Sequence, residues 1–233
     1  MNIDYALSRE KRPDFRYRLK RRTEEVLRAI GRYAPSAQTI VDLGTAEGKM
    51  LRDIKCRYPS AWCLGIDYSL PLLLFGRNTS RDIPLVCADI QKLAFIKSGT
   101  FDVIVATAVI EHLLSPRDML NETVRLLRPG GILILTSPHP FWEKVSGTLG
   151  WIKGNHHSVM SPRRLADLCR NEQLIIREDY GFMISPVGFW GERSIEAVLR
   201  KMRVDRILPN HLLVAQKQDK ETGLTNEAFI IPH

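Results

Sequence analysis

Short apolar segments alternate with helix-like segments along the middle of the chain. Strands are expected at 39–43, 62–67, 85–89, 101–106 and 132–137, with helices at 47–58, 69–77 and 118–128. The strand segments are apolar almost throughout rather than at every second position, which is typical of strands covered on both faces. The pattern predicts an α/β fold in which helices cover both faces of a mostly parallel sheet.

An amphipathic helix is predicted ahead of this alternation, within residues 1–35. Leu19, Thr23, Val26, Leu27 and Ile30 share one face, and Pro35 ends the helix. The opposite face carries six cations: Arg18, Lys20, Arg21, Arg22, Arg28 and Arg32. Such a face can be solvated, or it can contact anionic lipid, an anionic substrate or nucleic acid. We expect this helix to act as a lid or as a peripheral membrane contact.

The pattern is looser after the fifth predicted strand. Ser161-Pro162 is a strong helix start, followed by a strand at 174–177, a helix near 195–202 and a last strand at 212–215. Segments 138–160 and 181–195 are predicted to be insertions on the substrate side. We expect residues 1–233 to form a single domain.

Composition narrows the class of protein. The net charge is +8, the four cysteines lack metal-binding spacing, and the first residues carry no apolar secretion signal. No apolar run approaches the roughly 20 residues of a membrane span. These features predict a cytoplasmic protein, peripheral to the membrane if the basic helix binds lipid, with free thiols and no metal site.

Polar residues follow the predicted strands at the points where the strands end. They are Asp42 to Gly48, Asp67, Asp89, and the stretch from Thr107 to His112. Ligands of open α/β sheets bind where the carboxyl ends of the strands meet, so these residues should converge there. The small residues at 44–48 allow a ligand to approach the backbone, and the next helix offers free amides to an anionic group.

This arrangement favours a nucleoside cofactor. The carboxylate of Asp67 can accept both ribose hydroxyls, Asp89 can accept the adenine amino group, and Leu43 and Ile90 can sandwich the adenine. The dinucleotide fingerprint G-x-G-x-x-G is not matched, because Lys49 occupies the third glycine position. Ala46 replaces the middle glycine of the D-x-G-x-G-x-G pattern used for S-adenosylmethionine, and its methyl group is tolerable if φ is negative there.

Six motifs in order resemble class I S-adenosylmethionine-dependent methyltransferases, in particular the small-molecule branch typified by quinone-biosynthesis enzymes. The resemblance covers about 39–137. The motifs are Val41-Asp42-Leu43-Gly44-Thr45-Ala46-Glu47-Gly48, Gly65-Ile66-Asp67-Tyr68-Ser69, Cys87-Ala88-Asp89-Ile90, Phe101-Asp102-Val103-Ile104, Val109-Ile110-Glu111-His112-Leu113 and Leu127-Arg128-Pro129-Gly130-Gly131.

The resemblance implies a Rossmann-like sheet of seven strands, with the last strand antiparallel and supplied by 212–215. It also implies S-adenosyl-L-methionine as cofactor and S-adenosyl-L-homocysteine as product. Asp42 and Gly44 would flank the methionine portion, and the backbone at Ala106 and Thr107 would accept from its ammonium. Asp67 would hold the ribose, and Asp89 and Ile90 would meet the adenine. The expected cofactor site is completed by Leu43, Thr45, Gly48 and Tyr68.

Three histidines are candidates for a catalytic base or a substrate contact. His112 follows the fourth strand, His139 follows the fifth, and His157 lies in a segment similar to one in quinone O-methyltransferases. His211 and His233 are expected on the surface. Five aromatic residues in the insertions can roof an apolar pocket or form core under long loops: Phe141, Trp142, Trp151, Phe189 and Trp190.

The predicted function is methyl transfer to a small acceptor, of apolar or aromatic character if these aromatics form a roof. One alternative is a nucleic-acid or protein methyltransferase, suggested by the charge. The fourth strand, however, ends in Ala106-Thr107-Ala108-Val109 rather than the turn used on exocyclic base amines. The other alternative is a non-catalytic module that binds the cofactor and acts through partners.

Overall fold

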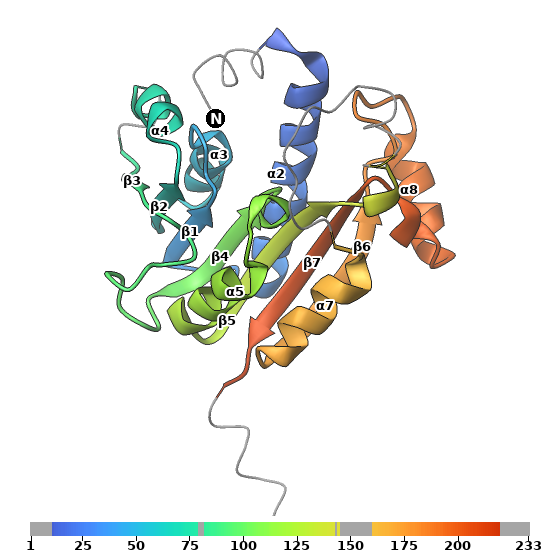
Figure 1. Cartoon of the computed structure of the whole chain (residues 1–233). Coiled ribbons are helices and arrows are strands. Elements are labelled where there is room, and N and C mark those ends of the chain that lie inside the picture. Colours follow the sequence, from blue (N-terminus) through green and yellow to red (C-terminus); the bar gives the residue numbers. More distant parts are fainter. Residues whose placement is uncertain (1–10, 79–81, 143, 145–159, 220–233) are drawn as a thin grey trace, which may run out of the picture.

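The chain folds around one mixed sheet of seven strands in the order β3-β2-β1-β4-β5-β7-β6 (Figure 1). The computed structural model describes residues 11–78, 82–142, 144 and 160–219. The strands are β1 (Thr39–Leu43), β2 (Trp62–Asp67), β3 (Leu85–Cys87), β4 (Phe101–Thr107), β5 (Leu127–Pro138), β6 (Leu174–Phe182) and β7 (Asn210–Lys217).

Strand direction defines the edge at which ligands are expected. β1 pairs in parallel with β2 and β4, β2 with β3, and β4 with β5, whereas β7 is antiparallel to both β5 and β6. The predicted seven-stranded sheet with an antiparallel last strand is therefore confirmed. The strands β1 to β6 all end at the same side of the sheet, which we call the carboxyl edge.

Helices cover both faces of the sheet. α2 (Pro13–Tyr33) and α3 (Lys49–Arg57) pack on one face, and α5 (Pro116–Leu126) and α7 (Pro162–Asn171) pack on the other. α4 (Leu70–Arg77) follows β2, and α8 (Glu192–Lys201) follows β6. Two short 3₁₀ helices, η1 (Ile110–His112) and η2 (Asp205–Ile207), complete the described elements. Each side of the sheet thus has its own apolar core.

The boundary between α5 and β5 differs from the prediction. α5 ends at Leu126 and β5 begins at Leu127, although the helix was expected to reach residue 128 and the strand to begin at 132. Leu127 pairs with Phe101, and the register then shifts before Val103 pairs with Ile132. Gly130 has φ +74, so this stretch forms an irregular strand start rather than a loop.

α4 packs directly on the turn after β1. A Cβ built on Gly76 would lie 2.4 Å from the carbonyl oxygen of Glu47, closer than van der Waals contact allows. Gly76 is itself buried within α4. The helix can approach the turn this closely only because residue 76 has no side chain.

Gly76→Ala should therefore destabilise the protein, although alanine is the better helix former. Overpacking of this kind costs about 1–3 kcal/mol in free energy of unfolding, measured by urea titration. Gly31→Ala in α2 is the matched control, because its nearest contact would be an ordinary 3.5 Å from the Tyr58 hydroxyl. That control should be stabilising by about 0.5–1 kcal/mol. Stabilisation by both substitutions would contradict the close approach of α4.

Candidate functional site

The turn between β1 and α3 is built from left-handed residues. Gly44, Ala46 and Gly48 have φ values of +79, +52 and +72. The φ of Ala46 is therefore positive, and the condition under which its methyl group is tolerable without strain is not met. An alanine in this conformation costs roughly 1–2 kcal/mol, and its methyl group packs against Leu72 and Phe75. The turn keeps this conformation because other parts of the chain hold it.

Asp67 holds the turn from the end of β2. Its Oδ2 accepts from the backbone N–H of Ala46 at 2.8 Å, and its Oδ1 accepts from that of Ser69 at 2.8 Å. The carbonyl of Ile66 accepts from Gly44 and Thr45, at 2.8 and 3.1 Å. A carboxylate has about four lone-pair positions, so Asp67 can still accept from a ligand after bracing the turn.

Asp42 is a buried carboxyl at the start of the same turn. Burial raises its pKa to about 7; Thr45 beside it lowers the pKa in part and Asp67 raises it further. Its Oδ1 and the Thr45 hydroxyl are buried without a hydrogen-bond partner among the described residues. Unsatisfied buried acceptors are costly, and a ligand that donates hydrogen bonds here would remove this cost.

The third strand end contributes Asp89, which is half-buried. Its Oδ1 accepts from the backbone and the side-chain N–H groups of Gln91, at 3.0 and 3.2 Å. Gln91 Oε1 is buried without a partner within the described part of the chain. Sequence reasoning missed Gln91, and the only available signal was its position two residues after an aspartate.

The side chains near the expected adenine position differ in how exposed they are. Leu43 is fully buried and Ile90 is almost so, and both belong to the core that faces α5 and α7. Tyr68, next to Asp67, is 81% exposed. The accessible flat surface beside Asp67 is therefore the Tyr68 ring.

The end of β4 closes directly over the turn. A Cβ on Gly44 would lie 2.6 Å from Cγ2 of Val109, so the two segments are in contact. Ala106 is buried and Thr107 is half-buried at the strand end. Ala108 has φ +52 and donates its N–H to Thr136 at 2.9 Å. The predicted convergence of the β1 turn and the β4 end is thus present.

Of the neighbouring residues Glu111 and His112, the first is buried and the second is exposed. Glu111 is 2% exposed, and burial raises its pKa to about 7, while Arg22 of α2 lowers it in part. Its Oε2 is buried with no hydrogen-bond partner in the described chain. His112, a candidate catalytic residue, has an exposed side chain. The buried member of the pair is therefore the acid.

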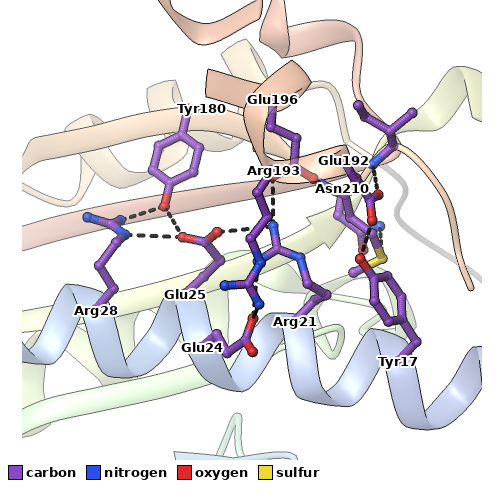
Figure 2. A network of polar contacts seen from close by, with 12 residues as sticks. Tyr17, Arg21, Glu24, Glu25, Arg28, Tyr180, Glu192, Arg193, Glu196 and Asn210 are labelled. Carbon is purple, nitrogen blue, oxygen red and sulfur yellow. Dashed lines mark hydrogen bonds and ion pairs between the residues drawn. The ribbon is translucent and has the colours of Figure 1, made fainter. Parts of the chain in front are cut away.

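The cationic face of α2 is engaged within the protein, an arrangement that was not among the alternatives drawn from the sequence. Figure 2 shows Tyr17 and Arg21 extending from α2 toward Glu192 and Glu196 of α8. Arg21 is 3% exposed and donates to Glu196 at 2.7 Å, and Tyr17 donates to Glu192. The same face bonds to the sheet: Arg28 to Glu178 and Tyr180, and Arg22 to Asn210 at 2.9 Å. These partners lie some 150–190 residues away, beyond the reach of a local pattern.

A cleft of about 480 Å³ separates α2 from the turn. One wall comes from α2, and the other comes from Glu47, Lys49 and Asp53. The α2 wall consists of Phe15, Arg16, Leu19, Lys20, Thr23, Glu24 and Leu27. The N-terminal helix therefore lies beside the turn, as a lid would, and its action as a lid stays a prediction.

Two histidines meet where β5 ends and β7 begins. His139 is half-buried, and burial and the neighbouring His211 lower its pKa. Its backbone N–H donates to the carbonyl of Pro209 at 2.8 Å, and its ring Nδ1 accepts from the backbone N–H of Phe141 at 3.3 Å. The expected surface position of His211 is wrong: it is 2% exposed and bonded to Asp179 through Nε2.

Several predicted site residues cannot be placed. The candidate His157, and also Trp151 and His233, lie outside the described residues. The four described aromatics of the insertions are all exposed rather than core: Phe141, Trp142, Phe189 and Trp190. In the described ranges no group of three or more His, Cys, Asp or Glu side chains is placed to hold a metal ion.

Comparison with known proteins shows which family the middle of the chain matches. Residues 41–135 match the family described as methyltransferase domain. Trans-aconitate 2-methyltransferase of Azoarcus sp. (strain BH72) is 33% identical over 107 residues, which cover 46% of this chain and 42% of that protein. Demethylmenaquinone methyltransferase of Streptomyces avermitilis is 31% identical over 119 residues, covering 51% and 49%. The matched region spans about half the length of these relatives or less.

A solved structure supports the same fold. It is a chain from the complex between the Haloferax volcanii Trm112 methyltransferase activator and a methyltransferase. The TM-score is 0.64 at 20% identity, with 85% of this chain and 91% of that chain covered. Residues 41–135 are therefore similar to a methyltransferase domain, and the fold is that of a solved structure at a TM-score of 0.64. The turn, Asp67, Asp89 and the β4 end all lie within the matched region of this domain.

The raised pKa of Asp42 gives the protein a pH-dependent stability. Between about pH 4 and pH 7 the Asp42 carboxyl loses its proton in the unfolded state but keeps it in the folded state. The free energy of unfolding therefore falls as pH rises. Asp42→Asn removes this loss. Urea unfolding at pH 5 and pH 7.5 should therefore show that the variant gains stability relative to wild type at the higher pH. Asp82→Asn, at an exposed site, is the control, and an equal change in both variants would contradict the assignment.

The buried ion pair between Arg21 of α2 and Glu196 of α8 can also be tested by urea unfolding. Arg21→Met leaves Glu196 buried without its cation, which should cost about 3–5 kcal/mol in free energy of unfolding. Arg193→Met is the matched control, because Arg193 forms an exposed pair with Glu24 at 2.6 Å. Exposed pairs contribute up to about 1 kcal/mol. Equal losses in the two variants, measured by urea titration, would show that the buried pair does not dock α2.

Proposed function

We propose that this chain binds S-adenosyl-L-methionine at the carboxyl edge and transfers its methyl group to a small acceptor. The observation that carries the proposal is the convergence of the left-handed turn, Asp67, Asp89 and the β4 end within a methyltransferase domain. The names of the relatives, for trans-aconitate and demethylmenaquinone, support a small-molecule acceptor.

The residues present fit this cofactor. Asp67 keeps lone pairs for ribose hydroxyls, and Asp89 and Gln91 offer acceptors for the adenine amino group. The unpartnered Oδ1 of Asp42 and the Thr45 hydroxyl suit a donor such as the methionine ammonium, with the backbone of Ala106 and Thr107 nearby. The missing Cβ of Gly44 lets Val109 close against the turn, so the end of β4 lies beside the backbone that the ligand would meet.

The chemistry needs little from the protein beyond alignment. The bound cofactor supplies a methyl group already activated on a sulfonium, so the chain has to orient the acceptor and exclude water. A base is required only if the acceptor must lose a proton. His139 suits that role, because its lowered pKa keeps the imidazole neutral near pH 7. His112 and His157 remain the other candidates.

The acceptor is proposed to be apolar or aromatic, because the insertions expose Phe141, Trp142, Phe189 and Trp190 on the same side as the carboxyl edge. The alternative of a nucleic-acid or protein acceptor rested on the charge of +8. Much of the positive charge on α2 is engaged by acids of β6 and α8, which weakens that alternative. The non-catalytic alternative predicts binding of the cofactor without turnover.

Peripheral membrane contact through the N-terminal helix is at most a secondary part of this proposal. None of the described helices is long and apolar enough to cross a bilayer. On the outer side of α2, Arg16 and Lys20 are exposed, whereas Arg21, Arg22 and Arg28 face the protein. Only the first group is available for lipid.

Asp67→Ala tests the cofactor site. The variant should bind S-adenosyl-L-homocysteine more weakly by about 1–3 kcal/mol, because the ribose loses a charged acceptor. Calorimetric titration measures the change, and Asp82→Ala on the exposed loop before β3 is the control. Unchanged affinity in Asp67→Ala would contradict the assignment, provided that thermal unfolding shows the variant folded. Consumption of S-adenosyl-L-methionine with lipophilic phenols would then separate an enzyme from a binding module.

A further inference from the structure

In the segment between β6 and β7 the acidic side chains are buried, whereas most of the basic side chains are exposed. Within residues 186–207 all three acids are buried and accept backbone N–H groups from the end of β6 and the turn after it. Glu192 accepts from Ile184 and Ser185 at 2.7 and 2.8 Å. Glu196 accepts from Met183 at 2.8 Å, and Asp205 from Gly181 at 2.9 Å. No carboxylate of this segment is therefore left on its outer surface.

Much of the outer surface of the same segment is apolar. Trp190 is 99% exposed, and seven further apolar side chains of the segment are also exposed. Trp142 joins them, because its indole N–H donates to the carbonyl of Ile207 at 2.6 Å. We call this surface the α8 patch; its apolar members are Trp142, Val187, Phe189, Trp190, Ile195, Val198, Met202, Val204 and Ile207.

Five cations are interleaved with these apolar residues: Arg193, Arg200, Lys201, Arg203 and Arg206. Arg193 and Arg206 form exposed ion pairs with Glu24 and Asp179, and Arg200 stacks over the Tyr180 ring at 3.7 Å. Lys201 and Arg203 are exposed and have no ion-pair partner in the described ranges. The α8 patch therefore combines apolar side chains with positive charge and no outward acid.

The patch is held rigidly at the carboxyl edge. Glu192 and Glu196, which anchor the turn after β6, are the same two acids that bond to Tyr17 and Arg21 of α2 (Figure 2). In Figure 1 the segment lies at the upper right, where β6 ends. An exposed apolar loop is thus fixed by buried hydrogen bonds next to the side of the sheet that holds the candidate cofactor site.

We propose that the α8 patch docks this protein on an anionic lipid bilayer. Amphipathic basic helices bind the interface of such bilayers with their apolar side chains inserted and their cations near the headgroups. Tryptophan is favoured at this depth, since one part of its ring system is apolar and its N–H is polar. The absence of any outward acid on the segment complements a negative surface. The proposal does not depend on methyl transfer.

Co-sedimentation of the full chain with vesicles tests the proposal. The protein should bind vesicles of equal parts phosphatidylcholine and phosphatidylglycerol, bind much less to phosphatidylcholine alone, and bind less in high salt. Lys201→Glu with Arg203→Glu should weaken binding by about tenfold or more. Phe189→Ser with Trp190→Ser should do the same. All four side chains are exposed, and thermal unfolding verifies that the variants are folded.

Arg16→Glu with Lys20→Glu on α2 is the matched control, because it reverses the same charge on another exposed surface. This variant should bind anionic vesicles within about twofold of wild type, since its cations lie away from the patch. Loss of binding in this control but not in the α8 variants would overturn the proposal in favour of the N-terminal helix. No binding to anionic vesicles would also overturn it. So would a dimer in light scattering that the Phe189→Ser, Trp190→Ser variant dissociates, since the patch would then be a protein interface.

Discussion

One carboxylate fixes the geometry on which the candidate site depends. Asp67 accepts from Ala46 on one side and from Ser69 on the other, and so it ties the turn after β1 to the start of α4. The turn contains an alanine in the left-handed conformation, which is unfavourable without such support. Gly76 and Val109 then close on the turn from two directions. A ligand would therefore meet a preorganised backbone rather than a flexible loop.

A second set of interactions joins the two ends of the described chain. A buried bond links Arg21 to Glu196, and part-buried bonds link Tyr17 to Glu192 and Arg28 to Glu178. A buried ion pair adds little net stability relative to an apolar contact, but it strongly disfavours arrangements in which one partner is left alone. We infer that these pairs fix which face of α2 packs on the sheet, and through Glu192 they fix the position of the turn after β6.

The sequence predicts the buried strands well, but it predicts the long-range partners of charged side chains poorly. β1 and β2 have the predicted boundaries, because an apolar run buried on both faces is a local signal. The start of β5 was missed, since the bulge at Gly130 depends on pairing with β4. The convergence of Asp42, Asp67 and Asp89 followed from topology. The φ of Ala46, the burial of His211 and the partners of Arg21 depend on contacts that no local pattern encodes.

Hydrogen exchange with and without S-adenosyl-L-homocysteine tests the central claim most directly, with NADH as the control ligand. Backbone amides exchange more slowly where a ligand covers or rigidifies them. The account predicts that S-adenosyl-L-homocysteine protects residues 42–48, 67–69, 89–91 and 106–112, and that NADH does not. Protection by neither ligand, or protection confined to residues 160–219, would contradict a cofactor site at the turn held by Asp67.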